Sequence, residues 1–295
     1  RPAFEDLDRA LTQPPARRTL PFVPAAPERG RAGAPAFTLS FRRWEQLTPD
    51  CLDQGPALVY LPCQELPGHE DALRRWAQAY PDIGFGVVLP RVVWDRELPR
   101  LRRELEAARQ AGVTQALLGH IGQLPLARSF GLIPRGDFGL GLTNDETAAE
   151  LARLGFASAT ASFESRLAQI RDLNKPLDLE LLVYGRLPLM LMEHCILRNR
   201  GQGCHCQDKP QSLGDRKGEH FPVEPAWGCR NELFNAKPLW LADKTDWRTA
   251  GAAYARLAFL REGPGECARV FRAYREGAGE PPRAFTRGLY YRGVE

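Results

Sequence analysis

Eight short β-prone runs, each followed by a helical or charged stretch, constrain the fold of this 295-residue chain more than any other feature. Several runs are nearly uniformly apolar, which is typical of strands buried on both faces of a parallel sheet. Eight such units predict a closed (β/α)₈ barrel, a TIM-barrel-like α/β fold; an open doubly wound sheet is the alternative, but no glycine-rich phosphate motif follows the first run. The expected strands are residues 36–41, 57–62, 84–90, 115–121, 137–142, 158–163, 179–185 and 255–260.

Amphipathic segments between these runs predict the helices of the barrel. Residues 70–80, 96–110 and 144–155 are the clearest cases. In the last of them, Asn144 or the following aspartate is expected to cap the first turn, and Gly155 to end the helix. These helices are expected to cover the outer face of the sheet.

Two regions depart from this rhythm. Residues 1–35 are rich in proline, alanine and arginine and read as a linker, with a short helix expected near residues 4–11. Residues 36–295 are therefore assigned to the barrel module. Within it, residues 191–245 separate the seventh strand from the eighth and predict a long excursion from the barrel mouth, which is usually a functional feature.

Composition restricts the class of protein. The net charge is +4, 43% of the residues are hydrophobic and 26% are charged, as in ordinary globular domains. No apolar run approaches the ~20 residues of a membrane helix, and the N-terminus has no signal-peptide core. An odd number of dispersed cysteines favours a reducing compartment, so a cytoplasmic protein without membrane partners is expected. Because the chain lacks an initiator Met, we expect it to be part of a longer protein.

Cysteines gather inside the excursion. Thiolates brought together on one loop-rich stretch commonly hold zinc or an iron–sulfur cluster. Zinc would also accept a histidine such as His194, which we treat as a secondary ligand candidate. The alternative is a set of unligated thiols in a flexible loop. The four candidate ligands are Cys195, Cys204, Cys206 and Cys229, and the single residue between the second and third is tight for two ligands of one metal.

Polar residues at the ends of the expected strands are the other site candidates, because barrel enzymes work at that face. Glu164 is the candidate general acid or base, with a helix-capping or salt-bridged role as its alternative. Arg186 is suited to binding a carboxylate or phosphate, unless it pairs with Glu180 or Glu164. His120 is a catalytic candidate or a structural histidine. The remaining strand ends offer Arg91, Asn144 and Arg261 for substrate binding.

Catalytic sequence motifs give little support to proteolysis. The chain contains no GxSxG, HExxH or Walker pattern. His194 and Cys195 offer one Cys–His pair for a protease, but sequence neighbours rarely form a catalytic dyad. The C-terminal tail, residues 283–293, alternates arginines with aromatic residues, which suits stacking on single-stranded RNA or packing onto the barrel.

Several motifs together resemble peptidase family U-32, the collagenase-like proteases. The similarity extends from about residue 36 to the end of the chain. GDFGLGLTN and ASFE resemble the family's fifth and sixth strands, and FTRGLYYRGV resembles its C-terminal signature. The most specific part comprises YGRLPLM (184–190), HC (194–195), DRKG (215–218), FPV (221–223) and FNAKPLWLAD (234–243).

The resemblance implies more than the peptidase label. Several members of the family are iron–sulfur proteins of RNA or quinone hydroxylation, so it implies a 4Fe–4S cluster in preference to zinc, with Cys63 or Cys267 as substitute ligands. It also implies an RNA substrate, ribosomal or transfer, and a C-terminal module that works with an N-terminal module of the same longer chain. A collagenase-like peptidase and a non-catalytic module that binds RNA or its partner are the alternatives.

Overall fold

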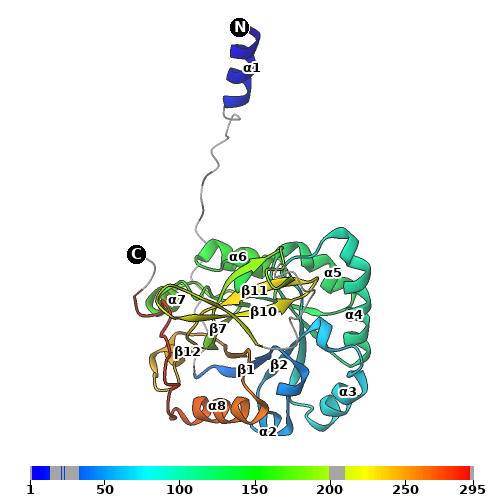
Figure 1. Ribbon diagram of the computed structural model, residues 1–295, viewed down its shortest axis with the longest axis vertical. Coiled ribbons are helices and arrows are strands. Elements are labelled where there is room, and N and C mark those ends of the chain that lie inside the picture. The colour runs from blue at the N-terminus through cyan, green and yellow to red at the C-terminus, as the bar shows by residue number, and fades with distance from the viewer. Residues whose placement is uncertain (1, 14–20, 22, 24–32, 199–209, 293–295) are drawn as a thin grey trace.

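Eight parallel strands close into a barrel in the computed structural model, which describes residues 2–13, 21, 23, 33–198 and 210–292 (Figure 1). Strand β13 lies between β1 and β7, and pairing of β6 with β7 closes the sheet. The predicted (β/α)₈ architecture is confirmed. The strands are β1 Ala36–Phe41, β2 Leu58–Pro62, β3 Gly84–Val88, β4 Gln115–Leu118, β5 Ile133–Gly136, β6 Ser158–Thr160, β7 Asp178–Gly185 and β13 Tyr254–Phe259.

The fifth strand was predicted in the wrong place. It is Ile133–Gly136, whereas the apolar run 137–142 contains a short 3₁₀ turn, η5 (Phe138–Leu140). Gly139 lies so close to the carbonyl oxygen of Gly119 that a Cβ would collide with it, and Gly141 adopts a φ of +63°. Alternating glycines therefore fold this run back on itself, while the true strand contains a proline and an arginine that its periodicity does not reveal.

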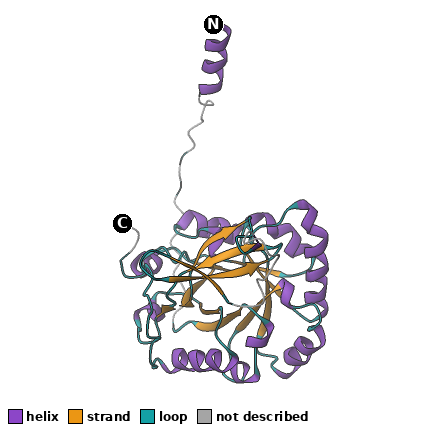
Figure 2. Cartoon of the chain, in the orientation of Figure 1, coloured by secondary structure: helices purple, strands orange, loops and turns teal. Residues whose placement is uncertain are grey.

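Helices surround the barrel (Figure 2). The three predicted most clearly are confirmed: Asn144 Oδ1 accepts the Thr147 amide at 2.8 Å at the start of α6, and Gly155 beyond its end has a φ of +73°. An N-terminal helix, α1 (Pro2–Thr12), also forms and buries no residue. No helix among the described residues is long and apolar enough to cross a membrane. The helices around the barrel are α2 Pro49–Leu52, α3 Glu70–Ala79, α4 Leu98–Gln110, α5 Leu124–Ser129, α6 Asp145–Arg153, α7 Leu167–Asp172 and α8 Pro264–Glu276.

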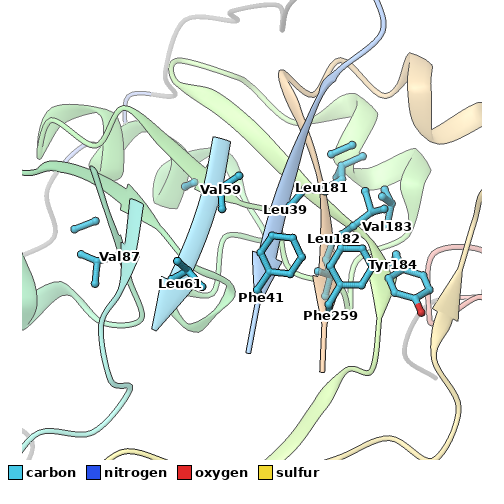
Figure 3. Close-up of a cluster of buried hydrophobic side chains, with 14 of the residues drawn as sticks. Leu39, Phe41, Val59, Leu61, Val87, Leu181, Leu182, Val183, Tyr184 and Phe259 are labelled. Carbon is cyan, nitrogen blue, oxygen red and sulfur yellow. The ribbon is translucent and has the colours of Figure 1, made fainter. Parts of the chain in front are cut away.

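Alternate strand residues build the apolar layer between barrel and helices. Leu39 and Phe41 of β1 and Val59 and Leu61 of β2 are buried in one continuous cluster (Figure 3). Side chains in a strand point alternately to its two faces, so the residues between these face the barrel interior. Burying such side chains stabilises the fold by about 1.5–3 kcal/mol each.

The barrel interior, by contrast, holds charges. Arg256 of β13 is buried, and its Nη2 donates to Asp137 Oδ1 at 2.7 Å and to Thr160 Oγ1 at 2.6 Å. Its Nε lies 3.3 Å from Glu180 Oε2 of β7, and Glu180 also accepts the Thr38 hydroxyl at 2.5 Å. Burial alone would lower the pKa of Arg256, but the two carboxylates outweigh it and raise this pKa. Two carboxylates thus offset the charge of the buried cation, although its Nε has no hydrogen-bond partner among the described residues.

The predicted excursion forms an antiparallel sheet over the barrel mouth. Its strands are ordered β8-β11-β10-β9, and a short β12 (Leu239–Trp240) then pairs with β7 and returns the chain to the barrel. We call this four-stranded element the cap sheet; it consists of β8 Pro188–Met192, β9 Gln211–Gly214, β10 His220–Ala226 and β11 Arg230–Phe234.

The C-terminal tail packs onto the barrel. Tyr290 is buried and donates its hydroxyl to the Leu182 carbonyl at 2.7 Å, while Phe285 packs against the core. Tyr291 is half exposed and donates to Asp246 at 2.8 Å. The packing interpretation of the tail therefore fits its aromatic residues better than stacking on RNA does.

Candidate functional site

A cavity of about 170 Å³ lies at the C-terminal ends of the strands, beneath the cap sheet. Barrel enzymes bind their substrates at this end. Strand residues that face inward, such as Leu117 and Leu182, contribute apolar surface. The cap sheet and the turn before β11 contribute the roof, which comprises Leu191, Trp227, Arg230, Glu232 and Phe234.

Two arginines at the ends of barrel strands share one carboxylate of the cap sheet in the cavity lining. Arg42 follows β1 and its Nη1 lies 3.0 Å from Glu232 Oε2; Arg91 follows β3 and its Nη1 lies 3.0 Å from Glu232 Oε1. The Glu232 side chain is only 9% exposed. Each guanidinium also lies near an aromatic ring, Arg42 at 5.7 Å from Phe234 and Arg91 at 5.0 Å from Phe138. Such surfaces can stack a planar group and bind an anion.

Arg186 lines the same cavity from the end of β7. It donates to the Asn235 carbonyl at 3.0 Å and to the Ala236 carbonyl, and among the described residues no ion pair joins it to a carboxylate. Glu180, one expected partner, pairs with Arg256 instead. Burial lowers the pKa of Arg186 from its usual value, yet guanidinium groups keep their charge in proteins. Arg186 therefore brings positive charge to the cavity.

Arg230 is the most buried cation of the roof and is well compensated. Its side chain is 2% exposed and pairs with Glu97 Oε2 at 3.1 Å and Glu193 Oε2 at 2.5 Å. The pKa of Glu97 is lowered because the Arg230 contacts outweigh the opposing effect of burial. This group joins the loop before α4 to the end of β8 and fixes one corner of the cap sheet.

The other predicted site residues lie outside the cavity lining. Glu164 is exposed, and its backbone amide donates to Ser162 Oγ at 3.3 Å. His120 is exposed at the start of a 3₁₀ turn, and partial burial lowers its pKa. Asn144 caps α6 and, since residues 137–142 are not a strand, it does not stand at a strand end. Arg261 pairs with Glu224 and fastens β10 to the barrel.

Sequence reasoning missed several cavity residues that the fold supplies. The sequence pattern could have identified one of them, because Arg256 is a lone charge inside an apolar strand. No local pattern identifies Arg42 and Glu232, since they are 190 residues apart in the sequence and only the fold brings them into contact. The residues that the sequence did not single out are Arg42, Asp137, Trp227, Arg230, Glu232 and Arg256.

Two of the predicted ligand cysteines lie in the loops at the same end of the cap sheet, after β8 and before β11. Met192 of β8 pairs with Asn231 of β11, and the Ile196 amide donates to Asn231 Oδ1 at 2.8 Å. Cys195 precedes that amide and is buried; Cys229 stands two residues before Asn231, is exposed and has a φ of +64°. The chain segment between the two thiols contains both remaining candidates.

The rest of the predicted ligand set is less informative. Cys204 and Cys206 fall outside the described residues. His194 is exposed beside Cys195. Within the described ranges no three His, Cys, Asp or Glu side chains are grouped closely enough to hold a metal ion. Thiolates such as those of Cys195 and Cys229 are the ligands that iron–sulfur clusters and zinc sites use.

The two substitute ligands are neutral thiols in buried positions. Cys63 Sγ donates to Glu104 Oε2 at 3.0 Å, and the same carboxylate oxygen accepts the Trp227 indole N–H at 2.7 Å. Burial and the adjacent carboxylate raise the pKa of Cys63 strongly. Cys267 lies in α8 near Cys51 of α2, and burial raises the pKa of both. Cys63 follows β2 and Cys267 lies in α8, so neither belongs to the cap sheet beside which Cys195 and Cys229 lie.

Alkylation should separate these classes of cysteine. In metal-free protein treated with iodoacetamide at about pH 8, Cys229 is expected to react, because it is exposed. Cys63 and Cys267 are expected to stay unmodified until the protein unfolds, since burial and raised pKa keep them protonated. Peptide mass spectrometry of native and denatured samples measures this. Rapid native labelling of Cys63 would contradict the buried Glu104 contact.

Comparisons with known proteins find only distant structural similarity to this chain. No protein-family model and no curated protein matches its sequence. Among solved structures it is similar to the U32 peptidase Mk0906, at 12% identity over 81% of this chain and 98% of that chain, with a TM-score of 0.46. A class V chitinase mutant from Cycas revoluta matches at 9% identity over 82% and 99%, with a TM-score of 0.41.

Proposed function

We propose that this chain is a module of an iron–sulfur-dependent enzyme that hydroxylates a nucleotide of RNA. The observation that carries the proposal is a small, arginine-rich and aromatic cavity beneath a cap sheet that also bears Cys195 and Cys229. The U-32-like sequence motifs support the same reaction class. Neither a paired Ser and His nor a zincin helix motif supports the peptidase alternative.

The cavity suits one part of a large substrate. Pockets for drug-sized ligands measure about 300–1,000 Å³, so a cavity of about 170 Å³ suits a single group such as one base. Proteins that modify a base commonly take it out of its stack and hold it between aromatic and apolar side chains. Phe138 and Phe234, each beside a guanidinium, offer such surfaces here.

Each part of the site has a distinct role in this proposal. The arginines bind the sugar–phosphate of the nucleotide, and the cap sheet excludes water from the cavity. Asp137, held at 2.7 Å by Arg256, provides a carboxylate in the cavity lining that can accept a hydrogen bond from the base. Cys195, Cys229 and a thiol from the segment between them would hold the cluster, which supplies redox chemistry when bound.

Mass spectrometry of cellular RNA tests the proposal. Cells that lack the full-length gene should lose one modified nucleoside, heavier than its parent by one oxygen atom, from ribosomal or transfer RNA. The wild-type gene should restore this nucleoside, and a gene carrying Cys195→Ala should not. Unchanged RNA in the deletion strain would reject hydroxylation. If RNA binds the purified protein but carries no such modification, the result would support the alternative of a non-catalytic RNA-binding module.

A further inference from the structure

Charge is unevenly distributed around the cavity. Arg256 and Arg230 each contact two carboxylates. Arg42 and Arg91 share the single carboxylate Glu232, and Arg186 donates to backbone carbonyls and has one buried carboxylate, Glu262, near enough to act on it without an ion pair among the described residues. The excess positive charge therefore lies on one side of the cavity, formed by the ends of β1, β3 and β7.

These three arginines surround one segment of the cap sheet. Arg42 contacts the ring of Phe234 and the side chain of Glu232, and Arg186 donates to the two residues that follow Phe234. Arg91 reaches the second oxygen of Glu232. The guanidinium groups thus converge from the barrel on a single strand, β11, and its end.

We propose that Arg42, Arg91 and Arg186 form a phosphate-binding subsite, and that Glu232 is an internal competitor which sets its affinity. The subsite takes a phosphate monoester or diester of a nucleotide, so this inference rests on the proposed function and names the group of its substrate that is bound. Glu232 uses its two carboxylate oxygens to take one donor from each of two arginines. A phosphate offers the same two-oxygen geometry with more charge.

Glu232 opposes the binding of phosphate by electrostatic repulsion. Glu232 is nearly buried, so its negative charge is poorly screened and repels an anion held by the same two guanidinium groups. Glu232 belongs to the cap sheet, and the arginines belong to the barrel. Phosphate binding therefore weakens the ion pairs of Glu232 with Arg42 and Arg91, which hold the cap sheet against the barrel. Phosphate affinity and closure of the cap sheet over the cavity are thus coupled.

Binding of uridine 5′-monophosphate, compared with uridine, tests this inference by calorimetry on the full chain. A pyrimidine probe is chosen because the cavity is small. Glu232→Gln keeps the size and polarity of the side chain and removes its charge. It should tighten binding of the monophosphate about tenfold and leave uridine binding unchanged.

Glu224→Gln is the matched control. Glu224 is a second, 13% exposed carboxylate that ties the cap sheet to a barrel arginine, Arg261, and it does not line the cavity. Its neutralisation should change affinity for the monophosphate less than twofold, if only local charge matters. Equal tightening by both variants would show a general charge or cap-loosening effect and would overturn the role of Glu232.

Arg91→Gln keeps the inference testable if the Glu232 variant fails to fold. Arg91 is 34% exposed, so the substitution is expected to be tolerated. It should weaken monophosphate binding about tenfold and uridine binding much less, because uridine carries no phosphate. Unchanged affinity for the monophosphate in the Arg91 variant, or weaker binding in a folded Glu232 variant, would overturn the subsite. Phosphate-dependent binding in a protein that never acquires a cluster would instead reject only the proposed hydroxylation.

Discussion

Replacing Arg256 with methionine should lower the free energy of unfolding by about 3–5 kcal/mol. Arg256 is buried inside the barrel, and its removal leaves Glu180 and Asp137 without their cation. Two neighbouring carboxylates in a poorly hydrated interior repel each other, and the loss of the hydrogen bond to Thr160 adds to the cost. Denaturant titration followed by circular dichroism measures the change.

Two further variants separate this mechanism from a general effect of losing an arginine. Arg269→Met removes an arginine of α8 whose side chain is 72% exposed, and it should change stability by less than about 0.5 kcal/mol. Adding Glu180→Gln to the Arg256→Met protein should cost less than the two single changes summed, because the neutral amide removes one unpaired charge. Additive losses would show that Arg256 contributes packing and not charge pairing.

The interior network also shows how far the sequence predicts this fold. Apolar periodicity predicts the barrel, three of its helices and the position of the excursion, because burial against a helix layer demands an alternating or continuous apolar pattern. It fails at β5, where Pro134 and Arg135 form a strand and the more apolar run beyond it turns back on two glycines. Strand pairing across the barrel, a long-range effect, selects β5.

The candidate site was predictable only in part, for a related reason. Arg186 follows β7 directly and Arg91 lies three residues beyond β3, and the rule that barrel sites lie at strand ends places both in the cavity lining. The same rule proposed Glu164 and His120, whose side chains point to solvent because turns follow their strands. Glu232 could not be predicted, since its position over the barrel depends on how the cap sheet folds back.

The second large effect is expected at the cysteines. Protein purified without oxygen should contain about four iron atoms and four sulfides per chain if a 4Fe–4S cluster is bound. Cys195→Ala and Cys229→Ala should each lower the iron content to below about one atom per chain, since each removes a thiolate at the shared end of β8 and β11. Iron and sulfide assays, with a visible spectrum, measure the outcome.

Cys267→Ala is the matched control and also decides between ligand sets. Cys267 is buried in α8 near Cys51, outside the cap sheet, and burial raises its pKa. Its substitution should cost some stability, because a buried sulfur is lost, but should retain the cluster. Loss of iron in this variant, with retention of iron in Cys229→Ala, would show that Cys267 of α8 is a cluster ligand and Cys229 is not. One zinc per chain and no iron in the parent protein would leave the cysteines as a structural zinc site and remove the redox centre that hydroxylation requires.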